Sequence, residues 1–125
     1  MNKKNVARDK SKGFAVRIVS LYKHLCDEKK EYVLSKQVLR SGTSIGANLA
    51  EAEYAISEKE FLAKVYIALK ESAETVFWLE LLFQTEYITE VEYHSINEDA
   101  LALLKMLKAT TKTLTTKPEY LNSKL

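Results

Sequence analysis

Hydrophobic residues recur at alternating steps of three and four along most of the chain, which places them on one face of an α-helix. These stripes predict four helices, over about residues 11–27, 35–55, 58–85 and 89–114. The connections between them are short, which favours antiparallel neighbours. We therefore expect an all-α, up-down-up-down antiparallel four-helix bundle in a single domain over residues 1–125. Residues 1–10 are expected to form a flexible basic arm, and the segment after residue 114 a flexible tail.

Helix starts are marked by residues that accept hydrogen bonds from free backbone N–H groups. Ser35 is a candidate N-cap for the second helix. Ser57 with Glu60, and Thr89 with Glu92, form S/T-x-x-E patterns in front of apolar runs. These patterns predict that the third and fourth helices begin directly after tight turns.

The second predicted helix carries two glycines, Gly42 and Gly46, inside its periodic pattern. Glycine within a helix costs about 1 kcal/mol relative to alanine. Two of them four residues apart favour close approach by another part of the chain or by a bound group. The apolar stripe that contains the first of them is Val38, Gly42, Ile45, Leu49, Ala52 and Ile56.

The third predicted helix has more apolar residues around its circumference than one core requires. Its predicted inner stripe is Phe61, Val65, Ala68, Ser72, Val76, Leu79 and Phe83. A second stripe lies about 100° around the helix and consists of Leu62, Tyr66, Leu69, Ala73 and Phe77. Leaving such a row in water is costly, so the second stripe predicts an oligomer interface.

Charge is distributed unevenly although the net charge is only +2. Residues 1–49 hold eleven Lys or Arg against four Asp or Glu, residues 50–99 hold three against twelve, and residues 100–125 hold five against one. One interpretation is charge complementarity within the bundle. The other is a basic surface that binds RNA or DNA phosphates, with candidate residues Lys4, Arg8, Lys12, Lys105, Lys108 and Lys112.

Several classes of function find little support in the sequence. The single cysteine, Cys26, cannot form an internal disulfide, which favours a reducing compartment. No apolar run reaches the roughly 18 residues of a membrane span, and the start lacks a signal peptide's apolar segment. We expect a cytoplasmic protein. His24 and His94 lack the Glu-x-x-His pattern of di-iron bundles, and no phosphate loop or catalytic triad pattern is present. We therefore predict no metal, no cofactor and no enzymatic activity.

A polar constellation remains on the second and third helices, formed by Arg40, Ser41, Ser44, Asn48, Glu51, Glu71, Glu74, Thr75 and Trp78. Arg40 and Glu74 are each about seventeen residues from the turn at Ser57, so an antiparallel hairpin places them opposite each other. Three interpretations are open: a structural network that fixes helix register, a polar pocket for a small ligand or nucleic-acid group, and a catalytic site.

The same residues carry a family resemblance. The first motif is R-S-x-x-S-I-x-x-N-x-x-E-A, beginning at Arg40, and the second is A-x-K-E-x-x-E-T-x-x-W-L, beginning at Ala68. The chain that carries them resembles the bacterial four-helix-bundle family of 23S rRNA intervening-sequence proteins, and the similarity spans about residues 12–114. The resemblance implies small bundles that assemble as homopentamers around a central channel, with no established enzymatic activity.

Some relatives of this kind are encoded within insertions in 23S rRNA genes. A related branch serves as an accessory protein for the reverse transcriptase of diversity-generating retroelements, where a basic pentamer surface is linked to nucleic-acid binding. Three hypotheses follow. The first is an oligomeric adaptor that binds RNA or DNA, the second a protein-interaction scaffold without a nucleic-acid role, and the third a small-molecule site at Arg40 and Glu74.

Overall fold

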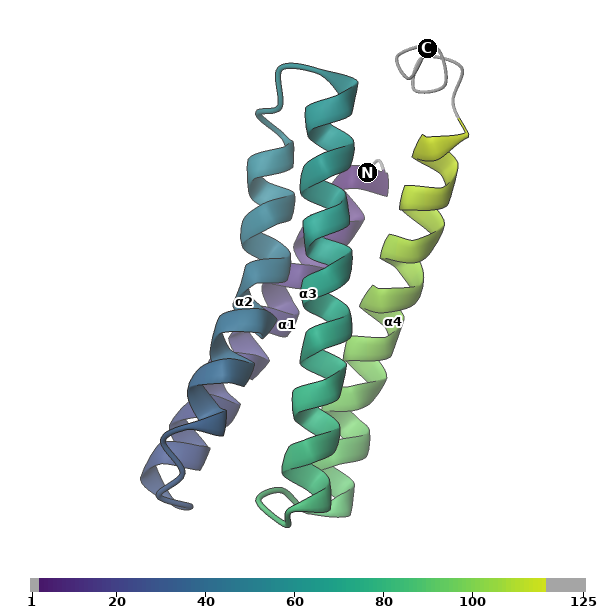
Figure 1. Ribbon diagram of the computed structural model, residues 1–125. Helices are drawn as coiled ribbons and strands as arrows, with labels where there is room; N and C mark the ends of the chain where they lie inside the picture. Colours follow the sequence, from purple (N-terminus) through teal and green to yellow (C-terminus); the bar gives the residue numbers. More distant parts are fainter. Residues whose placement is uncertain (1–2, 117–125) are drawn as a thin grey trace.

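The computed structural model describes residues 3–116, which form four helices connected by short turns (Figure 1). They are α1 (Lys3–Asp27), α2 (Leu34–Ala52), α3 (Glu58–Gln84) and α4 (Glu90–Thr115). Each helix packs against the next in sequence, and α4 also contacts α1. The predicted all-α, up-down-up-down bundle is therefore confirmed. None of the described helices is long and apolar enough to cross a membrane.

The first helix begins at Lys3, so the expectation of a flexible arm over residues 1–10 is wrong for its described part. Ala7 is buried in the core and Ser11 is fully buried. Arg8 Nη1 donates to Glu53 Oε1 over 2.7 Å, which ties this end of α1 to the end of α2. These contacts stabilise two further helical turns that the polar sequence did not indicate. The predicted flexible tail lies mostly outside the described residues.

The start of α2 is capped by a residue that the sequence did not single out. Glu31 is buried, and its carboxylate accepts hydrogen bonds from the backbone N–H groups of Val33, Leu34 and Ser35, over 3.1, 3.0 and 2.6 Å. Ser35 is not the N-cap, because it lies inside the helix with its side chain fully buried. A carboxylate at a helix N-terminus also interacts favourably with the helix dipole.

The other two predicted starts are correct. Ser57 Oγ accepts from the backbone N–H of Glu60 over 3.0 Å at the start of α3. Thr89 and Glu92 form a complete capping box before α4. The end of α2 differs from expectation, because the helix stops at Ala52 and Ile56 lies in the turn with 92% of its surface exposed.

The two glycines of α2 lie where α1 crosses it. A Cβ at Gly42 would be 2.7 Å from Ile18 Cγ1 and 2.9 Å from Ile18 Cγ2, and one at Gly46 would be 3.2 Å from Ser11 Oγ. Ile18 and Ser11 are both fully buried. The inference of close approach is confirmed, and the approaching group is α1.

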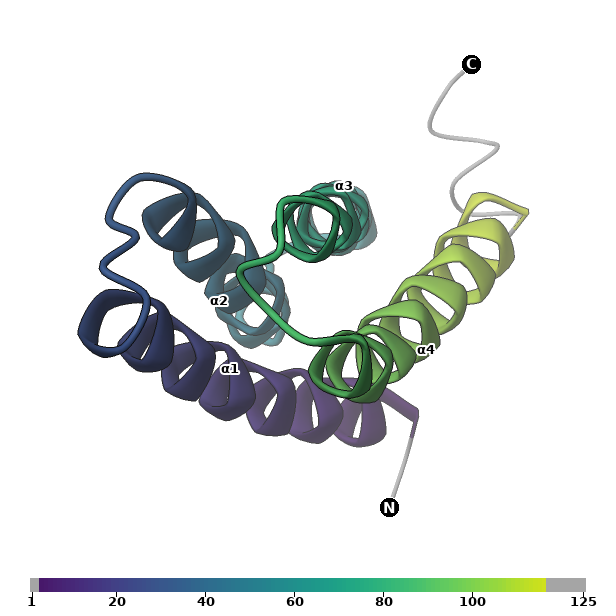
Figure 2. The same ribbon diagram turned by 90° about the horizontal axis from the view of Figure 1, so that it is seen from below.

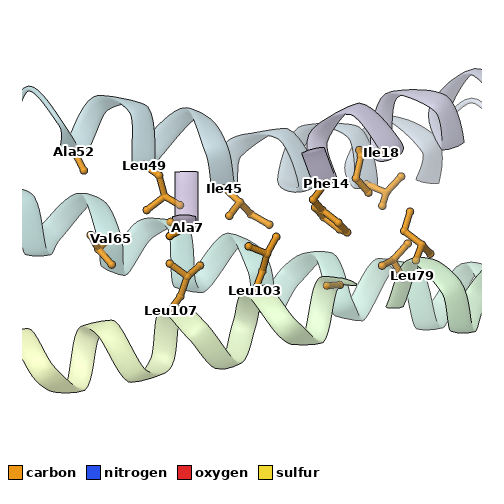
Figure 3. Packing of buried hydrophobic residues seen from close by; sticks show 14 of the residues in the cluster. Ala7, Phe14, Ile18, Ile45, Leu49, Ala52, Val65, Leu79, Leu103 and Leu107 are labelled. Carbon is orange, nitrogen blue, oxygen red and sulfur yellow. The ribbon is translucent and has the colours of Figure 1, made fainter. Parts of the chain in front are cut away.

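The core is continuous along the bundle, and side chains from all four helices meet in it (Figure 3). In α3 the buried positions are Leu62, Val65, Ala68, Ser72, Thr75, Leu79 and Leu82. The predicted inner stripe is therefore wrong at Phe61, Val76 and Phe83, which are only half-buried. From Val65 onward the buried positions follow the repeat of about 3.5 residues that keeps a seam facing its neighbours. The repeat places Thr75 in the buried position and leaves the more apolar Val76 half-buried.

Candidate functional site

The predicted charged pair between α2 and α3 is present. One Arg40 guanidinium nitrogen bonds Glu74 and the other lies 3.3 Å from Glu71 Oε2. Trp78 Nε1 donates to Glu74 Oε2 over 2.8 Å. Gln37 Oε1 accepts from Arg40 Nε and Nη2, so one arginine connects three neighbouring side chains. The guanidinium is exposed, whereas Glu71 and Glu74 are half-buried.

Beneath this pair lies a buried hydroxyl contact. Thr75 Oγ1 bonds Ser41 Oγ over 3.0 Å, and both residues are fully buried. Thr75 Oγ1 also donates to the Glu71 carbonyl over 2.8 Å. A buried hydroxyl without a partner costs about 1–3 kcal/mol, so this contact favours one register of α2 against α3.

The remaining members of the constellation do not join the Arg40 cluster. Ser44 Oγ donates to the Arg40 carbonyl, and Asn48 Nδ2 donates to the Ser44 carbonyl, both within α2. Glu51 forms a separate ion pair with Lys64 over 2.9 Å. The contacts that connect α2 to α3, and so can fix their register, are therefore those of Arg40, Ser41 and Glu51.

The electrostatics of Glu74 agree with this description. The hydrogen bond from Trp78 lowers the pKa of the Glu74 carboxyl most, burial opposes it, and the Arg40 guanidinium lowers it further. The result is a pKa below the ordinary value, so this carboxyl is ionised at neutral pH. An ionised, paired carboxylate is suited to hold Arg40 rather than to donate a proton.

The predicted oligomer stripe on α3 is only partly exposed. Leu62 is buried in the core at 6% exposure and cannot form an interface, and Leu69 is half-buried against the core. Tyr66 and Phe77 are 42% and 57% exposed, and Ala73 is also exposed. Ile67, which neither predicted stripe contains, is 41% exposed on the same helix. The exposed apolar surface of α3 therefore consists of Tyr66, Ile67, Ala73 and Phe77 and does not include Leu62.

The candidate basic residues fall into two groups. Arg8 is occupied by Glu53 and Asp9, and the side chain of Lys4 lies outside the described part of the chain. Lys12 and the three lysines of α4 are exposed, and none of them has a carboxylate within 4.0 Å among the described residues. The α4 lysines are Lys105, Lys108 and Lys112, at steps of three and four. They form one row on the outside of that helix.

Arg17 also connects two helices, although no sequence pattern predicts this contact. Its guanidinium bonds Asp99 Oδ2 over 2.7 Å, the Ser95 carbonyl over 3.1 Å and Ser95 Oγ over 2.8 Å. These bonds join α1 to the first half of α4. The charge complementarity proposed from the sequence is therefore present at Arg8, Arg17 and Arg40, but not along the α4 lysines.

Comparison with known proteins identifies the family. The family model for 23S rRNA-intervening sequence protein matches residues 3–109. The chain belongs to this family. It is also similar to a solved structure, a protein with unknown function from the S23 ribosomal protein family of Bacteroides thetaiotaomicron VPI-5482, at 58% sequence identity and a TM-score of 0.86. That match covers 89% of this chain and 99% of the other. No match was found among curated proteins.

Residues that match the two family motifs therefore form the α2–α3 seam of this 23S rRNA-intervening sequence family member. Arg40, Glu71, Glu74 and Trp78 are joined by hydrogen bonds, and Ser41 with Thr75 lies beneath them. The α4 lysines lie on a different face from the seam. Any role in phosphate binding is thus structurally separate from the network.

The Glu31 cap gives this family member a predictable response to acid. Burial raises the pKa of the Glu31 carboxyl more than any other single influence. The backbone N–H donors of Leu34, Ser35 and Val33 and the Ser35 hydroxyl together outweigh burial, so the pKa lies below the ordinary value. Because this pKa is lower in the folded protein than in the unfolded chain, the ionised carboxylate stabilises the fold at pH values above the ordinary glutamate pKa of about 4.3. This contribution to stability is lost as the pH falls through the lowered pKa.

We expect Glu31→Gln to destabilise the protein at pH 7 by about 1 kcal/mol, because a neutral amide replaces a charged cap. The difference from the wild type should shrink as the pH falls below about 4. Urea unfolding at a series of pH values measures it. Glu28→Gln, at an exposed carboxylate nearby, should match the wild type throughout. A Glu31→Gln deficit that does not change with pH would contradict the assigned cap.

Proposed function

We propose that this protein is a non-enzymatic homo-oligomer, with the homopentameric assembly that the family resemblance implies, and that it binds RNA or DNA through phosphate contacts. The observation that carries the proposal is the row Lys105, Lys108 and Lys112. These side chains are exposed and have no carboxylate partner among the described residues. Lysines in a row release counterions when they meet a phosphate backbone, and this contributes affinity without sequence selectivity.

The N-terminal half of α4 carries the opposite charge, which also supports phosphate binding at the C-terminal half. Its exposed charged residues are acidic, and they are Glu90, Glu92, Glu98 and Asp99. Asp99 is bonded to Arg17. The helix therefore changes from negative to positive along its length, and a polyanion is attracted only to its C-terminal half. Lys12 of α1 is a further exposed contact, whereas Arg8 is engaged by Glu53.

Self-association is supported by the outer face of α3. Phe77 and Ile67 are 57% and 41% exposed, and Phe77 packs edge-on against Trp78 at a ring-centroid distance of 5.0 Å. Aromatic residues beside an arginine are typical of interface centres. Arg40 lies beside these aromatic residues, because Glu74 bonds both Arg40 and Trp78.

Two measurements test the proposal. Fluorescence anisotropy with a labelled RNA should detect binding at about 50 mM salt that weakens strongly at about 200 mM. Light scattering should give a molar mass several times that of one chain. Absence of binding at both salt concentrations would refute the nucleic-acid role, and a monomer at micromolar concentration would refute the assembly.

A second candidate, a protein-interaction scaffold, is favoured by the turn between α2 and α3. Tyr54 and Ile56 are 83% and 92% exposed there, beside Glu53 and Glu58. Purification from native extract with and without nuclease separates the two functions. A partner that is retained after nuclease treatment, and lost with Tyr54→Ala and Ile56→Ala, would favour the scaffold.

A further inference from the structure

We infer that the outer side of the α3–α4 seam is selective for single-stranded nucleic acid, with Tyr66 stacking on an unpaired base while Lys105, Lys108 and Lys112 contact its phosphates. This inference rests on the proposed nucleic-acid role of the α4 lysines and goes beyond it. It adds an aromatic residue from another helix and a preference for one class of nucleic acid. It also assigns to Tyr66 a role other than contact between copies.

The register of the two helices places Tyr66 among the lysines. Phe83 of α3 stacks on Tyr93 of α4 with ring centroids 4.5 Å apart and planes within 5°. The helices are antiparallel, so equal numbers of residues counted away from this contact reach the same level. Tyr66 precedes Phe83 by 17 residues, and Thr110 follows Tyr93 by 17. Tyr66 is therefore level with the turn of α4 between Lys108 and Lys112.

The faces of the two helices agree with this register. Leu69, one turn after Tyr66, is half-buried against the core. Leu104 is half-buried on α4, and Lys108 follows it by four residues. Residues three or four apart share a face, so Tyr66 and Lys108 both emerge beside the packed seam. The two helices lie next to each other along this seam (Figures 1 and 2). The Tyr66 ring is 42% exposed, which leaves it available to a base.

An aromatic ring beside lysines distinguishes single strands from duplexes. Single-strand binding surfaces combine backbone contacts from cations with rings on which bases stack. In a duplex the base faces are already covered by neighbouring pairs, so an external tyrosine gains nothing. Phe77 is equally aromatic, but it is level with Asp99 in the acidic half of α4 by the same count. Of these two exposed aromatic residues of α3, Tyr66 is the one that is level with lysines of α4.

The test compares the Tyr66→Leu and Tyr66→Phe variants on two probes, an oligouridylate of about 12 nucleotides and an RNA duplex of about 12 base pairs. Tyr66→Leu should weaken oligouridylate binding about tenfold, because it removes one stacking contact, and should leave duplex binding unchanged. Tyr66→Phe retains the ring and should bind both probes as the wild type does. Tyr54→Leu, at an exposed tyrosine in the acidic turn, is the matched control and should change neither.

Four results would overturn the inference. Equal loss of affinity for both probes would mean that Tyr66 contributes no strand selectivity. If Tyr66→Leu binds oligouridylate as tightly as the wild type does, stacking is excluded. The proposed phosphate contact would still stand in that case, provided that the wild-type protein binds both probes. A reduced molar mass for Tyr66→Leu would identify the ring as a contact between copies. A wild type that binds neither probe would refute the proposed nucleic-acid role itself, and this inference with it.

Discussion

Gly42→Val is expected to destabilise the protein by about 2 kcal/mol or more, because it overfills the contact between α1 and α2. A Cβ alone would lie 2.7 Å from Ile18 Cγ1 and 3.0 Å from Ile18 Cδ1. Ile18 is fully buried and branched at Cβ, so it cannot move aside without disturbing the core. Either the helices separate or the two side chains adopt strained rotamers. Denaturant unfolding monitored by circular dichroism measures the loss.

Two further variants make this test specific. Gly13→Ala, at a helical glycine with nothing within 4 Å of the added Cβ, should stabilise the protein by about 0.5–1 kcal/mol through helix propensity. Ile18→Ala should make Gly42→Val less costly than it is in the wild type, because the clashing atoms are gone. Additive effects of Gly42→Val and Ile18→Ala would contradict the close approach.

The second large effect is expected on nucleic-acid binding. The triple variant Lys105→Gln, Lys108→Gln and Lys112→Gln should bind RNA about a hundredfold more weakly at about 100 mM salt, because three phosphate contacts are lost. The slope of log affinity against log salt should become shallower by about 2. Fluorescence anisotropy over a salt series measures both quantities.

The matched control removes the same amount of charge elsewhere. Lys23, Lys36 and Lys59 are exposed and lie on α1, α2 and α3. Their combined substitution by glutamine should leave affinity within about threefold of the wild type, since only long-range attraction changes and salt screens it. If this control loses as much affinity as the α4 variant, binding depends on net charge rather than on the lysine row.

Features set by local spacing were predictable from the sequence. Arg40 and Glu74 could be paired because both are equally far from the turn at Ser57, and a helix rises by a constant amount per residue. The close approach at Gly42 and Gly46 could be inferred because glycine in a helix needs a compensating contact. The Ser57 and Thr89 caps follow a short pattern that requires no tertiary information.

Features that depend on tertiary contacts were not predictable in the same way. Glu31 looks like any polar loop residue, and its capping role appears only once the chain folds back over it. Thr75 was passed over for Val76 because hydrophobicity alone ignores the hydroxyl pairing with Ser41. Residues 3–10 are mostly polar, and their helix is stabilised by Ala7 packing in the core and by the Arg8–Glu53 pair.

The most direct test of the proposed nucleic-acid surface is a lysine acetylation footprint of the oligomer with and without saturating RNA. Mass spectrometry then reports the reactivity of each lysine. We predict that RNA protects Lys105, Lys108 and Lys112, while the exposed Lys36 and Lys59 react equally in both samples. Equal reactivity of the three α4 lysines with and without bound RNA would contradict the proposal.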